Sequence, residues 1–216
     1  MKPAIEELLA SPTLPETVAR LTATLADERS RRLRFYDEIT PEMKAEFISG
    51  QVIMHSPATY EHTQIRGFIE SLLGNYVNLH DLGVVTGEKS LCVFPRNDYE
   101  PDVVFFGTEK AAKLRRKTLK FPIPDLVCEI LSDSTEKRDR GVKFQDFEAH
   151  GVREYWIVSP DRREMEQYIL EKGSYVLRMK SRTGEVASVV VKGFRAPLAA
   201  FFDSKANLAA LRKIIG

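Results

Sequence analysis

The sequence predicts an α+β or mixed α/β fold, in which a central mixed β-sheet is flanked by helices. Three observations lead to this prediction. Residues 59–80 carry apolar side chains at helical spacing, residues 126–158 have the pattern of a strand, a helix and a second strand, and several short apolar runs are separated by turn residues. The crossover favours parallel strands and the short runs favour antiparallel pairs, so the sheet should be mixed.

The N-terminal part of the chain is expected to be helical over residues 1–34. This segment ends in a cluster of arginines: Arg29, Arg31, Arg32 and Arg34. The cluster fits either a solvated helix end or a patch that contacts phosphate. Residues 45–57 follow as two extended segments around Ser49-Gly50, which is typical of a β-hairpin.

The clearest helix covers residues 59–80. Its apolar stripe, at spacings of three and four, consists of Ile65, Phe68, Ile69, Leu72, Leu73 and Tyr76. The segments VVTGEKSLCVF and EPDVVFFG then predict two strands joined by a turn at residues 95–98. Residues 109–120 follow as a strongly basic stretch with little apolar periodicity.

The second half of the chain begins with LVCEILS, residues 126–132, which predicts a mostly buried strand. Residues 136–149 predict a helix that ends just before Gly151. The strand REYWIVSP and a hairpin through Gly173 complete the predicted sheet.

A last helix closes the chain, and we expect it to turn Leu208, Leu211 and Ile215 inward.

Composition limits the kind of protein this is. The formal net charge is only +1, so any site for a polyanion must come from local clustering of charge. Cys92 and Cys128 each lie in an apolar run with no zinc-binding spacing, and we expect both to be buried, reduced thiols. The sequence starts without the apolar core of a signal peptide and has no apolar run near the ~20 residues that span a bilayer. These observations favour a cytoplasmic protein without a membrane partner.

Glu129 is the first candidate for chemistry, because it lies inside the apolar run LVCEILS. A buried carboxylate is costly unless it is paired, protonated or bound to a metal. Asp102 begins an earlier strand after Pro101, and Lys143 lies in the helix that follows Glu129. Two carboxylates on neighbouring strands beside one lysine predict a site for Mg²⁺, which is usually held by one or two carboxylates together with water and substrate phosphate.

Simpler explanations exist for two of these residues. Asp102 also fits a turn cap after proline, and Lys143 also fits a solvated helix face with Glu136 and Asp139. Asp125 forms a second Pro-Asp pair, but on one strand it would lie ~13 Å from Glu129, too far to share one ion.

These motifs resemble the PD-(D/E)XK nuclease superfamily. The segments PDVVFF, PDLVCEILSDST and KRDRGVKFQDFEAHGVREYWIVSP are similar, more closely, to the bacterial Uma-type restriction endonucleases, over residues 45–168. The resemblance implies a restriction-endonuclease-like fold and metal-dependent cleavage of DNA. It places a nuclease-like domain at residues 35–180, between an N-terminal helical extension at 1–34 and a C-terminal strand and helix at 181–216 that pack on the same domain.

The resemblance also implies the roles of the site residues. Asp102, Glu129 and the backbone carbonyl of Ile130 would hold Mg²⁺ or Mn²⁺. The superfamily pattern places its lysine two residues after the glutamate, where this chain has Leu131. Lys143, from the following helix, would supply the amine instead, since its long side chain can span such a gap.

Supporting residues are predicted around this set. Glu88 and His62 are candidates for a place at the site, although a salt bridge at the rim suits Glu88 equally well and a capping role suits His62. The basic stretch supplies candidate nucleic-acid contacts: Lys113, Arg115, Arg116 and Lys117.

The prediction for function is therefore a Mg²⁺- or Mn²⁺-dependent endonuclease that acts on DNA, as a homodimer because cutting a duplex needs two active sites. The alternative is a nucleic-acid-binding or regulatory module on the same fold with weak or no catalysis, which Leu131 favours. A metal-free hydrolase with two carboxylates, such as a glycosidase, is a third reading that leaves the basic stretches without a purpose.

Overall fold

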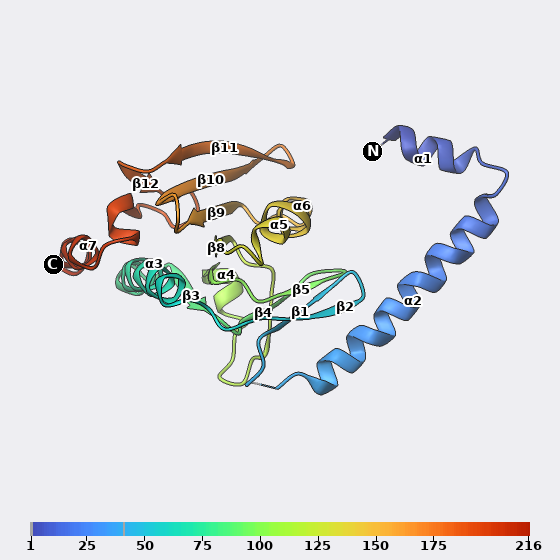
Figure 1. The fold of residues 1–216 in the computed structure, drawn as a ribbon, viewed down its shortest axis with the longest axis horizontal. Coiled ribbons are helices and arrows are strands. Elements are labelled where there is room, and N and C mark those ends of the chain that lie inside the picture. Colours follow the sequence, from blue (N-terminus) through green and yellow to red (C-terminus); the bar gives the residue numbers. More distant parts are fainter. Residues whose placement is uncertain (1, 41) are drawn as a thin grey trace.

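The computed structural model describes residues 2–40 and 42–216. The chain starts with two helices, α1 (Lys2–Leu9) and α2 (Leu14–Glu38), and the first of these and most of the second project away from the body of the molecule (Figure 1). The predicted N-terminal helical segment is therefore confirmed, with a break between the two helices and an end four residues later than expected.

The C-terminal turns of α2 fix this arm to the body. Phe35 is buried and stacks on Phe47, with ring centroids 5.8 Å apart. The Arg32 guanidinium pairs with the buried carboxylate of Asp98 and donates to the Phe94 and Asn97 carbonyls. Of the predicted arginine cluster, Arg32 is thus neither solvated nor free for phosphate, because it anchors the arm.

A six-stranded mixed sheet forms the centre of the molecule, in the order β11-β10-β9-β8-β6-β3. Its strands are β3 (Gly83–Gly87), β6 (Val103–Gly107), β8 (Leu126–Ile130), β9 (Glu154–Ser159), β10 (Glu164–Glu171) and β11 (Ser174–Ser181). β8 and β9 are parallel and the other pairs are antiparallel. The predicted crossover and the hairpin through Gly173 are both confirmed.

A second sheet of five short strands lies beside the first, in the order β2-β1-β5-β4-β7. Its strands are β1 (Ala45–Ile48), β2 (Gln51–Met54), β4 (Leu91–Val93), β5 (Asp98–Tyr99) and β7 (Lys120–Phe121). The hairpin at Ser49-Gly50 is confirmed, and both turn residues have positive φ, as a two-residue hairpin turn of this kind requires. A second sheet was not expected: VVTGEKSLCVF is split between β3 in one sheet and β4 in the other.

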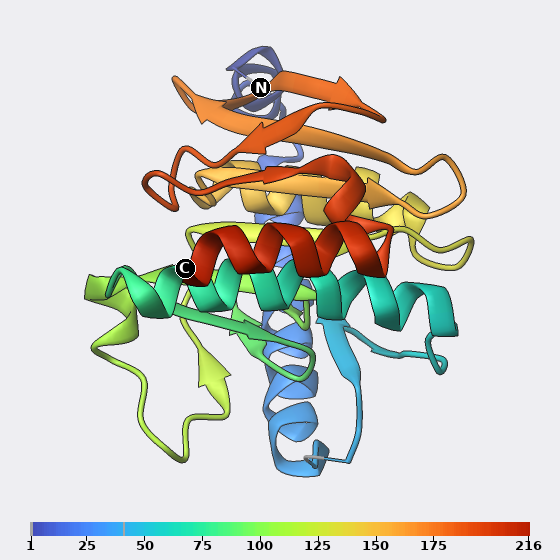
Figure 2. The ribbon, with the colours of Figure 1, turned by 90° about the vertical axis from the view of Figure 1, so that its left-hand side faces the viewer.

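One face of the central sheet is covered by α3 (Tyr60–Leu79) and α7 (Ser204–Ile215), which run side by side in Figure 2. The strands β12 (Glu185–Ala187) and β13 (Arg195–Pro197) and the 3₁₀ turn η2 (Leu198–Phe201) complete this side. Of the predicted stripe of α3, Ile65, Ile69, Leu72 and Leu73 are buried, while Phe68 and Tyr76 are partly buried. The prediction for α7 was wrong at Leu208 and Ile215, which are 49% and 58% exposed, because Asn207 and Ala210 face the core instead.

The other face of the central sheet packs against the second sheet and a helical segment. This segment consists of α5 (Glu136–Arg138), a π-helical turn η1 (Asp139–Lys143) and α6 (Phe144–Ala149). The helix predicted at 136–149 is confirmed, but its π-helical middle was not foreseen. Successive side chains of a strand alternate between faces, so Leu126, Cys128 and Ile130 face α3 while Val127 and Leu131 face the second sheet. Glu129 shares the face of Leu131.

The structure also bears on the two cysteines and on the absence of a predicted membrane span. Cys92 and Cys128 are buried and free of disulfides. Within residues 2–40 and 42–216, none of the helices has both the length and the apolar character needed to cross a bilayer. The fold class is the predicted one: a mixed central sheet with helices on it.

Candidate functional site

A cleft of about 660 Å³ opens where the carboxyl end of β8 meets the N-terminus of α3, the β1–β2 hairpin and the helical segment after β8. Its lining includes Asp102, Glu129, Ile130, His62 and Lys143. Of the residues that sequence analysis assigned to catalysis, metal binding or their support, only Glu88 is outside the lining. The cleft is therefore the candidate site.

Asp102, directly before β6, and Glu129, on the neighbouring strand β8, are linked by hydrogen bonds from backbone N–H groups to their carboxylates. The Asp102 N–H donates to Glu129 Oε2 over 3.3 Å, and the Ile130 N–H donates to Asp102 Oδ2 over 2.9 Å. Leu131 N–H bonds to Val158 on β9, so the backbone groups of Ile130 face the opposite side, towards Asp102. The Ile130 carbonyl therefore points away from β9 as well, to the side of β8 on which Asp102 lies.

Lys143 approaches Glu129 from the helical segment, and both side chains are buried. Its Nζ lies 2.9 Å from Glu129 Oε1, 2.8 Å from Glu46 Oε1 and 3.4 Å from Asp139 Oδ1. Lys143 ends the π-helical turn η1, a form that commonly marks functional sites. Leu131, in the position where the superfamily pattern has its lysine, is 6% exposed and packs in the apolar core.

The charges of this cluster do not balance. Burial raises the pKa of Glu129 well above its usual value, and the nearby charges of Asp139, Asp102 and Glu46 act in the same direction while Lys143 opposes them. Burial works against the charge of Lys143 as well, but the surrounding carboxylates more than offset it and raise its pKa. The amine is therefore charged, and the carboxylates exceed what one lysine can neutralise.

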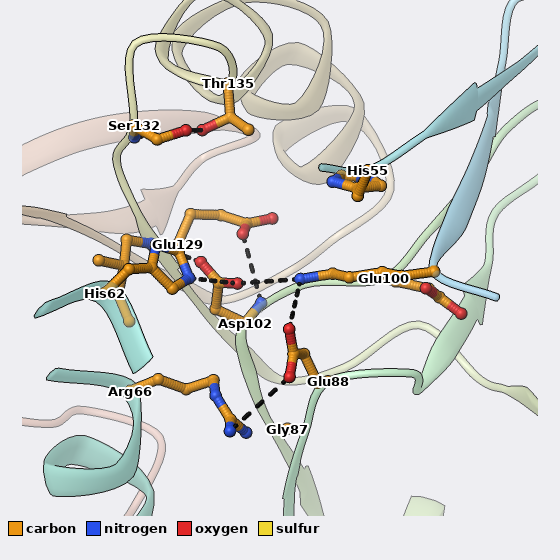
Figure 3. A network of polar contacts seen from close by, with 12 residues as sticks. His55, His62, Arg66, Gly87, Glu88, Glu100, Asp102, Glu129, Ser132 and Thr135 are labelled. Carbon is orange, nitrogen blue, oxygen red and sulfur yellow. Dashed lines mark hydrogen bonds and ion pairs between the residues drawn. The ribbon is translucent and has the colours of Figure 1, made fainter. Parts of the chain in front are cut away.

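Asp102 faces a different set of partners. His62 Nε2 lies 3.1 Å and Lys44 Nζ 3.5 Å from Asp102 Oδ1, and Figure 3 shows the His62 ring directed at this carboxylate. Burial alone would raise the pKa of Asp102, but His62, Lys44 and the Ile130 N–H lower it to about 2. His62 thus contacts a candidate ligand, rather than only capping the start of α3.

Glu88 is held at the rim of the site by cations. It follows β3, whose end pairs with the start of β6 beside Asp102, so the expected proximity arises through β3 rather than through the strand LCVF. Lys44 Nζ lies 3.0 Å from one Glu88 oxygen. Arg66 lies 3.7 Å from the other, and Figure 3 shows its guanidinium directed at Glu88. The structure therefore places Glu88 in a salt bridge beside the cleft.

Sequence analysis missed Glu46 and His55 as parts of the site. Glu46 is fully buried on β1, accepts from the Glu100 N–H over 3.0 Å and lies 3.1 Å from His55 Nε2. Burial opposes its charge, but Lys143 and His55 lower its pKa to about 2. The run AEFI carried the same signal as LVCEILS, a carboxylate inside an apolar strand, and could have identified Glu46.

The basic stretch lies elsewhere. It follows β6 and the short helix α4 (Thr108–Ala111), at the opposite end of β6 from Asp102. None of the predicted contacts there lines the cleft: Lys113, Arg115, Arg116 and Lys117. Arg115 donates to the carbonyls of Ala112 and Leu114 instead. Asp125, set aside as a ligand, pairs with Lys110 and Arg153 outside the cleft.

The oxygen ligands in the cleft suit a hard cation that takes only a few of its ligands from the protein. Within the described residues, no three His, Cys, Asp or Glu side chains converge closely enough to hold a metal ion by themselves. Asp102, Glu129 and the Ile130 carbonyl would offer oxygen ligands only, which Mg²⁺ accepts when water or phosphate completes its coordination. The unbalanced negative charge at Glu129 fits such an ion.

Comparison with known proteins agrees with this geometry. Residues 28–199 match the model of the Uma2 family, described as "Putative restriction endonuclease". The chain belongs to this family. Membership of the Uma2 family supports a nuclease-type function.

Two relatives of this Uma2 protein extend the comparison. An uncharacterized protein of Synechocystis sp. is 28% identical over 128 residues, which cover 58% of this chain and 65% of the relative. A crystal structure from Anabaena variabilis, titled as a putative nuclease of DUF820, superposes with a TM-score of 0.67 at 18% identity. That match covers 82% of this chain and 96% of the other, so the two proteins share the fold.

Proposed function

We propose that this Uma2 protein is a metal-dependent endonuclease that hydrolyses phosphodiester bonds in DNA. Asp102, Glu129 and the Ile130 carbonyl would hold Mg²⁺ or Mn²⁺, and Lys143 would act as the catalytic amine. One observation carries the proposal: the buried carboxylates of Glu46, Glu129 and Asp139 surround Lys143 in a solvent-accessible cleft, and the carboxylate of Asp102 lies beside Glu129. The excess negative charge is what a bound cation would offset.

Each residue contributes through its position. Bound there, a divalent ion would polarise a phosphate and lower the pKa of a water. His62 and the Ile130 N–H hold the Asp102 carboxylate in place and keep it ionised. Lys143 remains charged beside Glu129 and would stabilise the negative charge that develops on the phosphate oxygens.

The test compares three variants of the full chain. Glu129→Gln removes a ligand with little change in shape, Lys143→Met removes the amine, and Glu171→Gln alters an exposed glutamate of β10 as the matched control. Mg²⁺ binding is measured by calorimetry and nicking of supercoiled plasmid by gel electrophoresis. We expect Glu129→Gln to lose both, Lys143→Met to bind Mg²⁺ but lose roughly 100-fold or more in nicking rate, and Glu171→Gln to behave as wild type.

Two results would contradict the proposal. If wild type binds no divalent ion, the carboxylates are not a metal site. If nicking continues unchanged in Glu129→Gln, the cleft is not where the bond breaks.

A second candidate function is a nucleic-acid-binding module without catalysis. Leu131 in the usual lysine position and the close contacts of Lys143 with Glu46, Glu129 and Asp139 favour it. It predicts DNA binding that persists in EDTA and no nicking under any condition, and the assay above separates the two functions. The predicted homodimer remains a proposal, which sedimentation of the full chain would test.

A further inference from the structure

Most cations that line the cleft are already paired with carboxylates. Lys44 contacts Glu88 and Asp102, and Lys143 contacts Glu46, Glu129 and Asp139. The two histidines are also paired, His55 with Glu46 and His62 with Asp102. These four side chains therefore already contact carboxylates of the acidic cluster.

Arg138 is different. It lines the same cleft and is half-buried, yet it makes no ion pair with any residue in the described part of the chain. Its Nε is shielded from solvent and has no hydrogen-bond acceptor among those residues. The nearby carboxylates are engaged elsewhere, since Glu136 pairs with Arg140 and Arg162 while Asp139 contacts Lys143.

A guanidinium in this state is a ready site for an anion. A buried N–H without an acceptor is unfavourable, and the planar guanidinium fits two oxygens of a phosphate at once. Arg138 immediately precedes the π-helical turn that ends in Lys143, so one helical segment carries both the amine and the unpaired guanidinium. The segment begins after a loop whose hydroxyls also line the cleft, at Ser132, Ser134 and Thr135.

We propose that Arg138 binds a backbone phosphate of the nucleic acid that enters the cleft. The inference rests on the proposed nuclease function, because it takes the substrate of that function as the ligand. It assigns phosphate binding in the cleft to Arg138 rather than to the basic stretch at the opposite end of β6. Arg138 would bind one phosphate of the nucleic-acid backbone, while Lys143 acts at the phosphate whose bond is cleaved.

The test uses Arg138→Ala and Arg138→Lys, with Lys137→Ala as a matched control. Lys137 is the adjacent cation on α5, but it is exposed and does not line the cleft. Binding of a fluorescein-labelled short duplex is followed by anisotropy in EDTA, where no cleavage occurs, from 50 to 300 mM salt. Competition by inorganic phosphate is measured on the same samples.

We expect Arg138→Ala to weaken duplex binding roughly tenfold and to lower the slope of log affinity against log salt by about 1, as the loss of one phosphate contact should. Arg138→Lys should recover part of the affinity, and Lys137→Ala should bind nearly as wild type. Because Arg138 contacts no acceptor among residues 2–40 and 42–216, its removal should leave the thermal midpoint unchanged. Competition by free phosphate that depends on Arg138 would show that the site takes phosphate as such, and its absence would show that it needs the polymer.

The inference is overturned if Arg138→Ala keeps the affinity and salt slope of wild type, or if Lys137→Ala loses as much. It is also overturned if wild type does not bind the duplex. Binding that depends on Arg138 in a wild type that never nicks DNA would instead reject the nuclease proposal and leave the phosphate site standing.

Discussion

Glu129 and Glu154 are both buried glutamates on adjacent strands of one sheet, but on opposite faces, and they are satisfied in different ways. In the described part of the chain, the donors to Glu154 are all neutral: Trp156 Nε1 at 2.6 Å, Gln167 Nε2 at 2.6 Å, Ser188 Oγ at 2.7 Å, Val189 N–H at 2.8 Å and Val190 N–H at 3.1 Å. Glu129 has the Lys143 amine and one long bond from the Asp102 N–H. The Glu154 carboxylate thus has a hydrogen-bond donor at each of its acceptor positions. The Glu129 carboxylate lies near other negative charges.

The difference shows that burial of a carboxylate does not by itself indicate a metal site. Glu154 begins the strand β9 after Arg153, and it is as deeply buried as Glu129. Its donors join β9 to β10 and to the loop after β12, so it holds the chain together. Only Glu129 opens onto the cleft, where a ligand can complete its coordination.

Replacing Glu154 should cost the most stability. Glu154→Ala would leave several buried N–H and O–H donors without an acceptor, and we expect the free energy of unfolding to fall by about 3–5 kcal/mol. Urea unfolding followed by tryptophan fluorescence and circular dichroism measures this loss. Glu171→Ala, on the exposed end of β10, is the control and should change the stability by less than about 0.5 kcal/mol. A Glu154→Ala protein within about 1 kcal/mol of wild type would show that its donors find other partners.

Glu154 also shows that the hydrogen-bond partners of a buried carboxylate cannot be predicted from its local sequence. Local patterns predicted the strand containing Glu129, the crossover helix and the α3 stripe, because these depend on periodicity along a short segment. Whether an embedded carboxylate is satisfied depends on distant residues, such as Gln167 and Ser188 for Glu154. No pattern within REYWIVS reveals those partners.

Replacing Lys143 should cause the second-largest loss in the free energy of unfolding. Lys143→Met leaves the buried carboxylates of Glu46, Glu129 and Asp139 without their shared cation, and we expect a loss of about 3 kcal/mol at pH 8. The raised pKa of Lys143 means that its contribution is fully present below its unfolded pKa and is lost only as the pH rises through its folded pKa. The variant should recover stability as the pH falls towards 5, because its carboxyls then take up protons.

Urea unfolding of wild type and Lys143→Met at several pH values checks this expectation, with Lys205→Met, an exposed lysine of α7, as the control. A stability difference that stays constant from pH 8 to pH 5 would mean that Lys143 acts through packing rather than through charge.

The candidate site could be predicted only in part, because some of its residues meet through contacts between distant segments of the chain. Asp102 and Glu129 could be brought together because a neighbouring-strand arrangement follows from the order of elements. The reach of Lys143 could be anticipated from its side-chain length, but not the π-helical turn that ends at it. The run AEFI marks Glu46 as an embedded carboxylate, but its meeting with Lys143 and His55 depends on the packing of the second sheet against the first, which sequence spacing does not show.

Glu129→Gln should have the smallest effect on stability, and of opposite sign to that of Glu154→Ala. The folded-state pKa of Glu129 is raised, so its ionised form destabilises the fold above that pKa, and wild type gains stability as the pH falls through it towards the unfolded value of about 4.5. In EDTA at pH 8 we expect the glutamine variant to be more stable than wild type by about 1 kcal/mol, with the advantage fading by about pH 4.5. Mg²⁺ should reverse the order, since binding to the folded state would stabilise wild type alone. If the glutamine variant is less stable than wild type in EDTA, the carboxylate of Glu129 is as well satisfied as that of Glu154, and the case for a cation in the cleft fails.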